Sequence, residues 1–227
     1  MGFPTGDRYT GAPEQKQHLE RSYLRKAQFM SEHATPIWNG EFGPVYADPA
    51  FDVDAATINE ERYNLLSEQL RIYDKYKINW SIWLYKDIGL QGMIYTNPNS
   101  KWNQTIKPFL DKKRKFCLDA WGRHPSSEPD AAVKQLSDWI DRVSPSAKFT
   151  YPTSWNTQTH VMRNVFYTFL AATFVDEFAD LFKGMDETEL EELARSFHFD
   201  QCVQREGLNR ILQDHARVSQ KEITLLN

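Results

Sequence analysis

Residues 35–43 read TPIWNGEFG, a short apolar run that ends in glycines. Such a run predicts a buried strand that opens into a loop, with Glu41 near the point where the strand ends. Residues 79–85 read NWSIWLY, which alternates along its length and is rich in β-forming side chains. The sequence KDIG follows it directly. The chain is therefore expected to form a second strand at residues 79–85.

Helical patterns surround both strands. Residues 13–33 carry apolar side chains at helical spacing, and Thr57 with Glu60 matches a capping box for a helix that continues to about Tyr76. A third helix is expected at about 103–118. The order helix, strand, helix, strand, helix implies βα units on a parallel sheet. Because two strands do not make a stable sheet alone, further strands are expected from elsewhere.

The sequence changes character after residue 118. Residues 123–130 have the composition of a linker, and four helices are expected after it, at 131–143, 156–183, from Asp186, and at 203–216. Asn156 is a suitable N-cap for the longest of them, and Gly184 a suitable stop. This pattern predicts two parts, an α/β segment at 1–118 and an all-helical extension at 119–227.

Charge and hydropathy exclude several classes of protein. The chain has 27 basic and 31 acidic residues and a net charge of −4, which gives no electrostatic footprint for nucleic acid. No apolar stretch is long enough to cross a bilayer, so no membrane partner is expected. The N-terminal residues do not form a signal peptide, and the two cysteines require no oxidising compartment, which favours a cytoplasmic location. The six histidines show no metal-ligand spacing, and no cofactor or metal is expected.

Glu41 and Trp83 stand out as site residues because each lies near the end of a strand. In parallel α/β barrels the catalytic side chains sit at the C-terminal ends of the strands. A sugar presents flat C–H faces that pack on aromatic rings, so a tryptophan beside a carboxylate suits glycoside chemistry. The alternatives are a loop glutamate at position 41 and core packing of Trp83. Lys86 and Asp87 could orient a substrate from the following loop, or they could form a local salt bridge.

These two stretches together resemble glycoside hydrolase family 5, the cellulase-like family. The resemblance implies a (β/α)8 TIM barrel, of which residues 1–118 would supply strands 7 and 8 with their flanking helices. It implies that Glu41 is the nucleophile of a retaining enzyme and that Trp83 floors the subsite beside the scissile bond. The helical tail is similar to an extension found in certain fungal members. The implied partner is a carbohydrate, a β-glucan or β-glucoside.

The second catalytic group of that family is missing from the sequence. Its acid/base glutamate usually lies in the sequence Asn-Glu-Pro, which does not occur here; Ser127-Glu128-Pro129 is the nearest match and lies in the linker. The chain is therefore expected to be the C-terminal portion of a longer enzyme and to be inactive by itself. The alternative is a non-catalytic remnant or a helical interaction module.

Overall fold

The computed structural model describes residues 8–49, 52–116 and 127–225. Their contacts group into two compact units, a sheet unit formed by residues 6–97 and 195–227, and a helical unit formed by residues 98–194. Each unit is described by itself below. The grouping differs from the expected division after residue 118, because the C-terminal segment packs with the strands.

The first four elements of the sheet unit follow the predicted order of helix, strand, helix and strand, whereas its three later strands were not predicted. Its elements are α1 (Pro13–His33), β1 (Trp38–Phe42), α2 (Ala55–Lys75), β2 (Asn79–Ile82), β3 (Lys86–Asp87), β4 (Ile94–Thr96), β5 (Cys202–Gln204) and α9 (Glu206–Leu225). Helix α1 has the expected bounds, whereas α2 begins two residues before Thr57, after the N-cap residue Asp54. The predicted strand at 79–85 ends early, at Ile82.

Two small sheets organise this unit. Strands β1 and β2 pair in parallel, as predicted, with Trp38 opposite Asn79 and Phe42 opposite Ile82. Strand β3 pairs in parallel with β4, and β4 pairs antiparallel with β5. Strand β5 lies in the segment that was expected to be all-helical. It is only three residues long, and its partner is more than a hundred residues away in sequence, so no local pattern predicts it.

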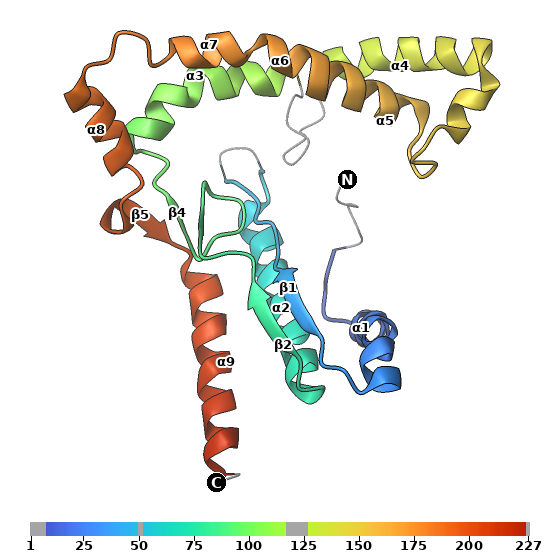
Figure 1. Ribbon diagram of the computed structural model, residues 1–227, viewed down its shortest axis with the longest axis vertical. Coiled ribbons are helices and arrows are strands. Elements are labelled where there is room, and N and C mark those ends of the chain that lie inside the picture. Colours follow the sequence, from blue (N-terminus) through green and yellow to red (C-terminus); the bar gives the residue numbers. More distant parts are fainter. Residues whose placement is uncertain (1–7, 50–51, 117–126, 226–227) are drawn as a thin grey trace. The chain divides into compact units, whose positions relative to one another are not determined.

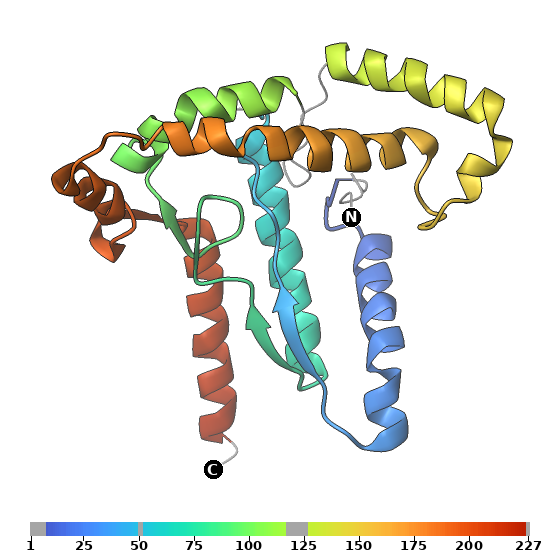
Figure 2. The ribbon, with the colours of Figure 1, turned by 45° about the horizontal axis from the view of Figure 1, so that its top comes forward.

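Helix α2 forms the centre of the sheet unit. It packs on one face of the β1–β2 pair, with α1 on the side of β1 and α9 on the side of β2 (Figures 1 and 2). The buried core contains residues from α2, from α9 and from the segments beside the strands: Tyr46, Leu66, Leu70, Tyr73, Ile78 and Leu208. This helix therefore buries one face of the two-stranded sheet.

The helical unit contains α3 (Lys101–Lys115), α4 (Ser127–Val143), the short helices η1 (Pro145–Phe149) and α5 (Thr157–Val161), the π-helix η2 (Met162–Leu170), α6 (Ala171–Thr173), α7 (Val175–Asp180) and α8 (Glu187–Arg195). The predicted helix at 156–183 is thus divided into four pieces. Its middle, from Met162 to Leu170, has the wider turns of a π-helix.

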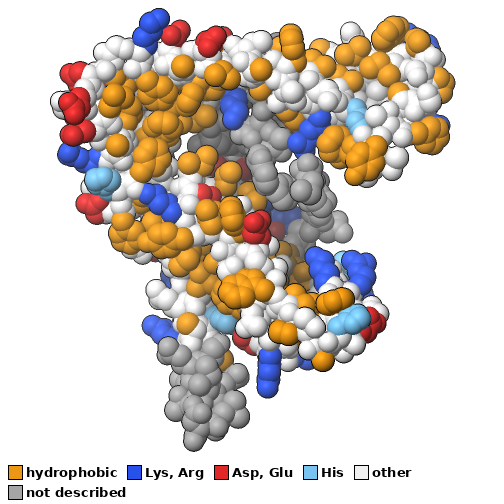
Figure 3. All heavy atoms as spheres, viewed as in Figure 1, with side chains coloured by type: hydrophobic (Ala, Val, Ile, Leu, Met, Phe, Trp, Pro, Cys, Tyr) orange, Lys and Arg blue, Asp and Glu red, His pale blue; other side chains and the backbone are white. Residues whose placement is uncertain are grey.

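Aromatic rings join α3 to the α7 region. Three rings along α3 and just after it, spaced seven residues apart, pair with three rings around α7, spaced four residues apart. The pairs run in opposite directions along the two segments: Trp102 with Phe182, Phe109 with Phe178, and Phe116 with Phe174. The ring centroids of these pairs are 5.1 to 5.6 Å apart. Hydrophobic side chains are also visible on the outside of the helices of this unit (Figure 3). Among the described residues, none of the helices has both the length and the apolar character needed to cross a bilayer.

Helix caps in the helical unit agree with the sequence. The Asn156 side chain accepts a hydrogen bond from the Thr159 N–H at 2.8 Å. Asp186 and Glu189 form a reciprocal capping box at the start of α8, with hydrogen bonds of 2.9 and 3.0 Å. Both starting points are therefore confirmed.

The cap at Asn156 gives a first testable expectation. We expect Asn156→Ala to lower the free energy of unfolding by about 1 kcal/mol, since the Thr159 N–H loses its acceptor. Asn156→Asp keeps an acceptor and serves as the control. Urea denaturation of the chain measures both, and equal loss in the two variants would contradict the capping role.

Candidate functional site

The two faces of the β1–β2 pair have different surroundings. Phe42, Trp80 and Ile82 face α2, where the Phe42 ring lies 5.0 Å from the Tyr73 ring and 5.3 Å from the Trp80 ring. Successive residues of a strand point to opposite faces, so Ser81 lies on the face away from α2. Among the described residues of the sheet unit, no helix covers that second face, which is called the open face here (Figures 1 and 2).

An irregularity in β1 directs Glu41 to the open face. Asn39 lies opposite Trp80 and Phe42 opposite Ile82, so β1 has one more residue than β2 between these pairs. A regular strand would turn residues three apart, such as Trp38 and Glu41, to opposite faces. The extra residue reverses this alternation, as a β-bulge does. Because Asn39 and Phe42 both face α2, both Trp38 and Glu41 reach the open face, and Glu41 is exposed to solvent.

Hydrogen bonds fix Trp38 and Ser81 on the same face. The Trp38 Nε1–H donates to Ser81 Oγ at 3.3 Å, and the Ser81 hydroxyl donates to the Gly40 carbonyl at 2.8 Å. The Trp38 side chain remains 68% exposed. The open face therefore carries an exposed aromatic ring on the same strand as Glu41.

Trp83 follows β2 and lies next to the end of β1. Its N–H donates to the Phe42 carbonyl at 2.8 Å, which places the Trp83 backbone beside the residue that follows Glu41. The Trp83 side chain is 44% exposed, so it is not a core residue. Gly43 has φ of +143°, and a Cβ there would lie 2.9 Å from the Trp83 carbonyl oxygen, so this close approach requires glycine.

Lys86 and Asp87 make contacts inside the protein. The Asp87 carboxylate accepts the N–H groups of Gly89 at 2.8 Å and of Gln91 at 2.5 Å, and so holds the loop that follows β3. The Lys86 ammonium donates to the Phe197 carbonyl. These contacts organise the loop, and no salt bridge between Lys86 and Asp87 is found in the described part of the chain. Their role toward a substrate remains a prediction.

Tyr73 of α2 supports β1 from the face of the sheet on which α2 packs. Asn39 Nδ2 donates to the Tyr73 hydroxyl at 2.8 Å. Burial raises the pKa of Tyr73, and the hydrogen bond from Asn39 offsets part of that rise. The tyrosine is therefore neutral over the ordinary pH range, and its role here is to hold β1 on α2.

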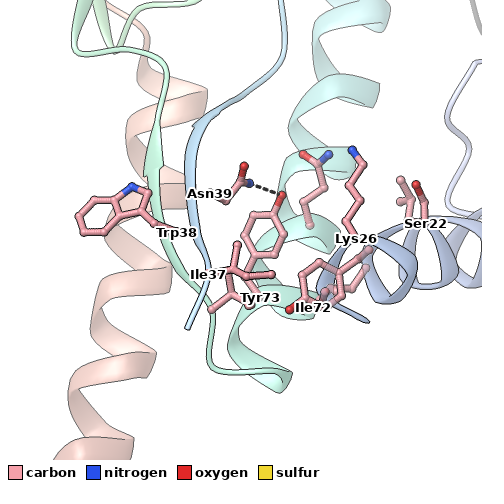
Figure 4. Close-up of a pocket in the computed structure, with 12 residues that line it drawn as sticks. Ser22, Lys26, Ile37, Trp38, Asn39, Ile72 and Tyr73 are labelled. Carbon is pink, nitrogen blue, oxygen red and sulfur yellow. Dashed lines mark hydrogen bonds between the residues drawn. The ribbon is translucent and has the colours of Figure 1, made fainter. Parts of the chain in front are cut away.

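A cavity of about 240 Å³ lies between α1, β1 and α2 (Figure 4). Apolar side chains such as Ile37, Ile72 and Tyr73 line it, and Ser22 and Lys26 border it from α1. It lies beside the edge of β1 that has no strand partner in the described part of the chain. Glu41 and Trp83 do not line it, so this cavity is separate from the open face.

The structure brings together two of the four predicted site residues. Glu41 and Trp83 come from the ends of neighbouring strands, whereas Lys86 and Asp87 are engaged with the loop. Of the other carboxylates, Glu128 belongs to the helical unit, and nothing is described of its side chain. Among the described residues no cluster of three or more His, Cys, Asp or Glu side chains could hold a metal ion.

Sequence reasoning missed Trp38 and Ser81 as site residues. Trp38 was treated only as part of the apolar strand, although Gly40 is a signal for irregular strand geometry. It also missed Arg205, whose long-range contacts have no local signature.

Comparison with known proteins gives one informative similarity. The chain is 39% identical over 224 residues to a protein of Phanerodontia chrysosporium named Beta-xylosidase. The match covers 95% of this chain and 46% of that protein, so the chain spans about half the length of the curated relative it matches. No protein-family model matches the chain. No solved structure matches it either.

Proposed function

We propose that this chain is the nucleophile-bearing portion of a retaining glycoside hydrolase that acts on β-glycosides. The observation that carries the proposal is that Glu41 and Trp83 lie at the neighbouring ends of two parallel strands, with the Trp83 N–H hydrogen-bonded to the Phe42 carbonyl. The similarity to a protein named Beta-xylosidase supports a glycosidase. The resemblance to glycoside hydrolase family 5 supports the same chemistry.

In this proposal the Glu41 carboxylate attacks the anomeric carbon and displaces the leaving group. A second carboxyl group about 5 Å from the first protonates the leaving oxygen and then activates water. The rest of a longer polypeptide supplies that second group, since the chain lacks an Asn-Glu-Pro sequence. Trp83 packs against the sugar ring at the same site.

The fold that we propose for the longer polypeptide is a (β/α)8 barrel, with β1 and β2 as neighbouring strands. Helix α1 precedes β1 and lies beyond the edge of β1 at which no described strand pairs (Figure 2). A right-handed crossover through α1 would bring a further parallel strand to that edge. The cavity between α1, β1 and α2 lies on the same side of β1, which supports a missing neighbour there.

The substrate is proposed as a β-linked pyranoside. Xylosides and glucosides share the flat sugar ring that packs on tryptophan, and they differ in the hydroxymethyl group at C5. The relative's name favours xylosides, whereas the family resemblance favours glucosides. The test joins this chain to the part of the Phanerodontia relative that it does not match, and compares aryl β-xyloside and aryl β-glucoside turnover. Absence of turnover on every β-glycoside would contradict the proposal.

The contribution of Trp83 can be measured in the same joined protein. We expect Trp83→Ala to lower kcat/KM about fivefold, because the aromatic packing on the sugar, worth about 1 kcal/mol, is lost. Trp139→Ala is the matched control, since Trp139 is also half-exposed but lies in the helical unit. A loss of the same size in both variants would exclude a specific contact at Trp83.

A further inference from the structure

Arg205 is a buried charge at the junction between β5 and α9. The residue is only 8% exposed, and it forms no ion pair among the described residues. Its Nε–H donates to the Gly92 carbonyl at 3.0 Å and its Nη2–H to the Gly89 carbonyl at 2.6 Å. A buried guanidinium requires such compensation, because desolvation of an unpaired charge is costly.

Two tyrosine rings lie against the Arg205 guanidinium. Its guanidinium carbon lies 4.2 Å from the centre of the Tyr46 ring and 4.6 Å from that of the Tyr95 ring. Both distances lie within the range of cation–π attraction. The guanidinium is therefore held in one orientation by two rings and two carbonyl groups.

The groups that Arg205 contacts belong to the segment that follows β1, to the loop between β3 and β4, and to β4 itself. Tyr46 lies in the segment after β1, only a few residues beyond Glu41, and its N–H donates to the Leu90 carbonyl at 2.7 Å. Gly89 and Gly92 lie in the loop between β3 and β4, beyond Trp83 and β3 in the chain. Residue 205 also donates its backbone N–H to the Met93 carbonyl at 2.9 Å. The Arg205 side chain thus joins the segment after β1 to the loop between β3 and β4.

We infer that Arg205 is a positioning residue that fixes Glu41 and Trp83 relative to each other by clamping the segment after β1, which follows Glu41, to the β3–β4 loop, which lies a few residues after Trp83. The effect on catalysis rests on the proposed function. The set of contacts that Arg205 makes with the two segments, called the clamp here, does not rest on it. The clamp gives the segment after residue 194 a role in the site, where the sequence suggested only a separate extension. Arg205 itself does not touch the substrate.

Lysine cannot replace arginine in this clamp. The planar guanidinium donates to two carbonyl groups in fixed directions while its faces stack on two rings. An ammonium group is a point charge without that fork, so it satisfies at most part of the set. Arg205→Lys therefore separates the geometry of the clamp from the presence of a charge.

The first test uses the 227-residue chain and needs no substrate. Hydrogen exchange is measured for Arg205→Lys and Arg205→Met, with Arg217→Met as control because Arg217 is exposed and pairs with Asp214 on its own helix. We expect exchange to become about tenfold faster at residues 43–47 and 84–95 in both Arg205 variants, and unchanged elsewhere in the sheet unit. Acrylamide quenching of Trp83, taken as the difference from Trp83→Phe, should increase in the same variants.

Unchanged exchange in both loops would overturn the inference, and so would equal acceleration throughout the sheet unit, which would indicate a general structural role. The second test measures kcat/KM of Arg205→Lys in the joined protein. We expect a loss of about tenfold or more, because small displacements of a catalytic group reduce the rate strongly. If the parent joined protein has no turnover, the proposed function fails while the exchange experiment still decides on the clamp.

Discussion

Glu41→Gln should reduce glycosidase turnover of the joined protein by about 10⁴-fold or more, because the amide oxygen cannot act as the nucleophile. Glu41 is exposed on the open face and forms no hydrogen bond or ion pair among the described residues, so the substitution should leave the fold unchanged. Initial rates on an aryl β-glycoside measure the effect. Glu14→Gln, in the first turn of α1, is the control.

A variant with a smaller side chain at position 41 distinguishes loss of the nucleophile from distortion of the site. Glu41→Ala leaves space beside the anomeric carbon, where added azide can attack in place of the carboxylate and release a glycosyl azide. We expect azide to restore part of the turnover in Glu41→Ala and to have no effect on the parent protein. Full activity of Glu41→Gln would exclude Glu41 as the nucleophile. The 227-residue chain by itself should show no turnover, since loss of general acid catalysis alone costs about 10²–10⁴-fold.

Leu208→Ala should destabilise the sheet unit by about 3 kcal/mol. The Leu208 side chain is 0% exposed and packs in the same core as Leu66 and Leu70 of α2. Truncation removes apolar contacts and leaves a cavity, for which the usual cost is about 2–5 kcal/mol. The effect would show that α9 is part of the fold that carries β1 and β2.

The matched control is Leu24→Ala, because Leu24 lies on α1 in the same unit but is 42% exposed. Urea denaturation followed by tryptophan fluorescence measures both variants. We expect Leu24→Ala to cost less than about 1 kcal/mol. Equal and small losses at both positions would mean that α9 does not contribute to the core.

The helices and the parallel strand pair could be predicted because their signals are local. Apolar spacing marked α1, and side-chain caps marked the starts at Asn156 and Asp186. Alternation in residues 79–85 correctly separated Ser81 from Ile82. The same pattern continued past the true end of β2, because alternation does not reveal where a strand leaves its partner.

The site was less predictable than the fold of its strands. Whether Glu41 faces the core or the open face depends on the extra residue in β1, and a change of one residue reverses every side chain in a strand. The assignment of Lys86 and Asp87 depended on their position after β2, whereas their contacts come from Phe197 and from the loop itself. Strand β5 and Arg205 contact residues that are more than a hundred positions away in sequence. Periodic patterns of side chains are local, so they do not predict such contacts.

The most direct test of the central claim is covalent trapping of the nucleophile. A 2-deoxy-2-fluoro β-glycosyl fluoride reacts with a retaining glycosidase to leave a glycosyl ester that hydrolyses slowly, because the fluorine at C2 destabilises the oxocarbenium-like transition state. The joined protein is treated with this reagent, digested and analysed by mass spectrometry. We expect one labelled carboxylate, Glu41, and no labelling in Glu41→Gln. An ester on any other carboxylate of an active protein would contradict this assignment.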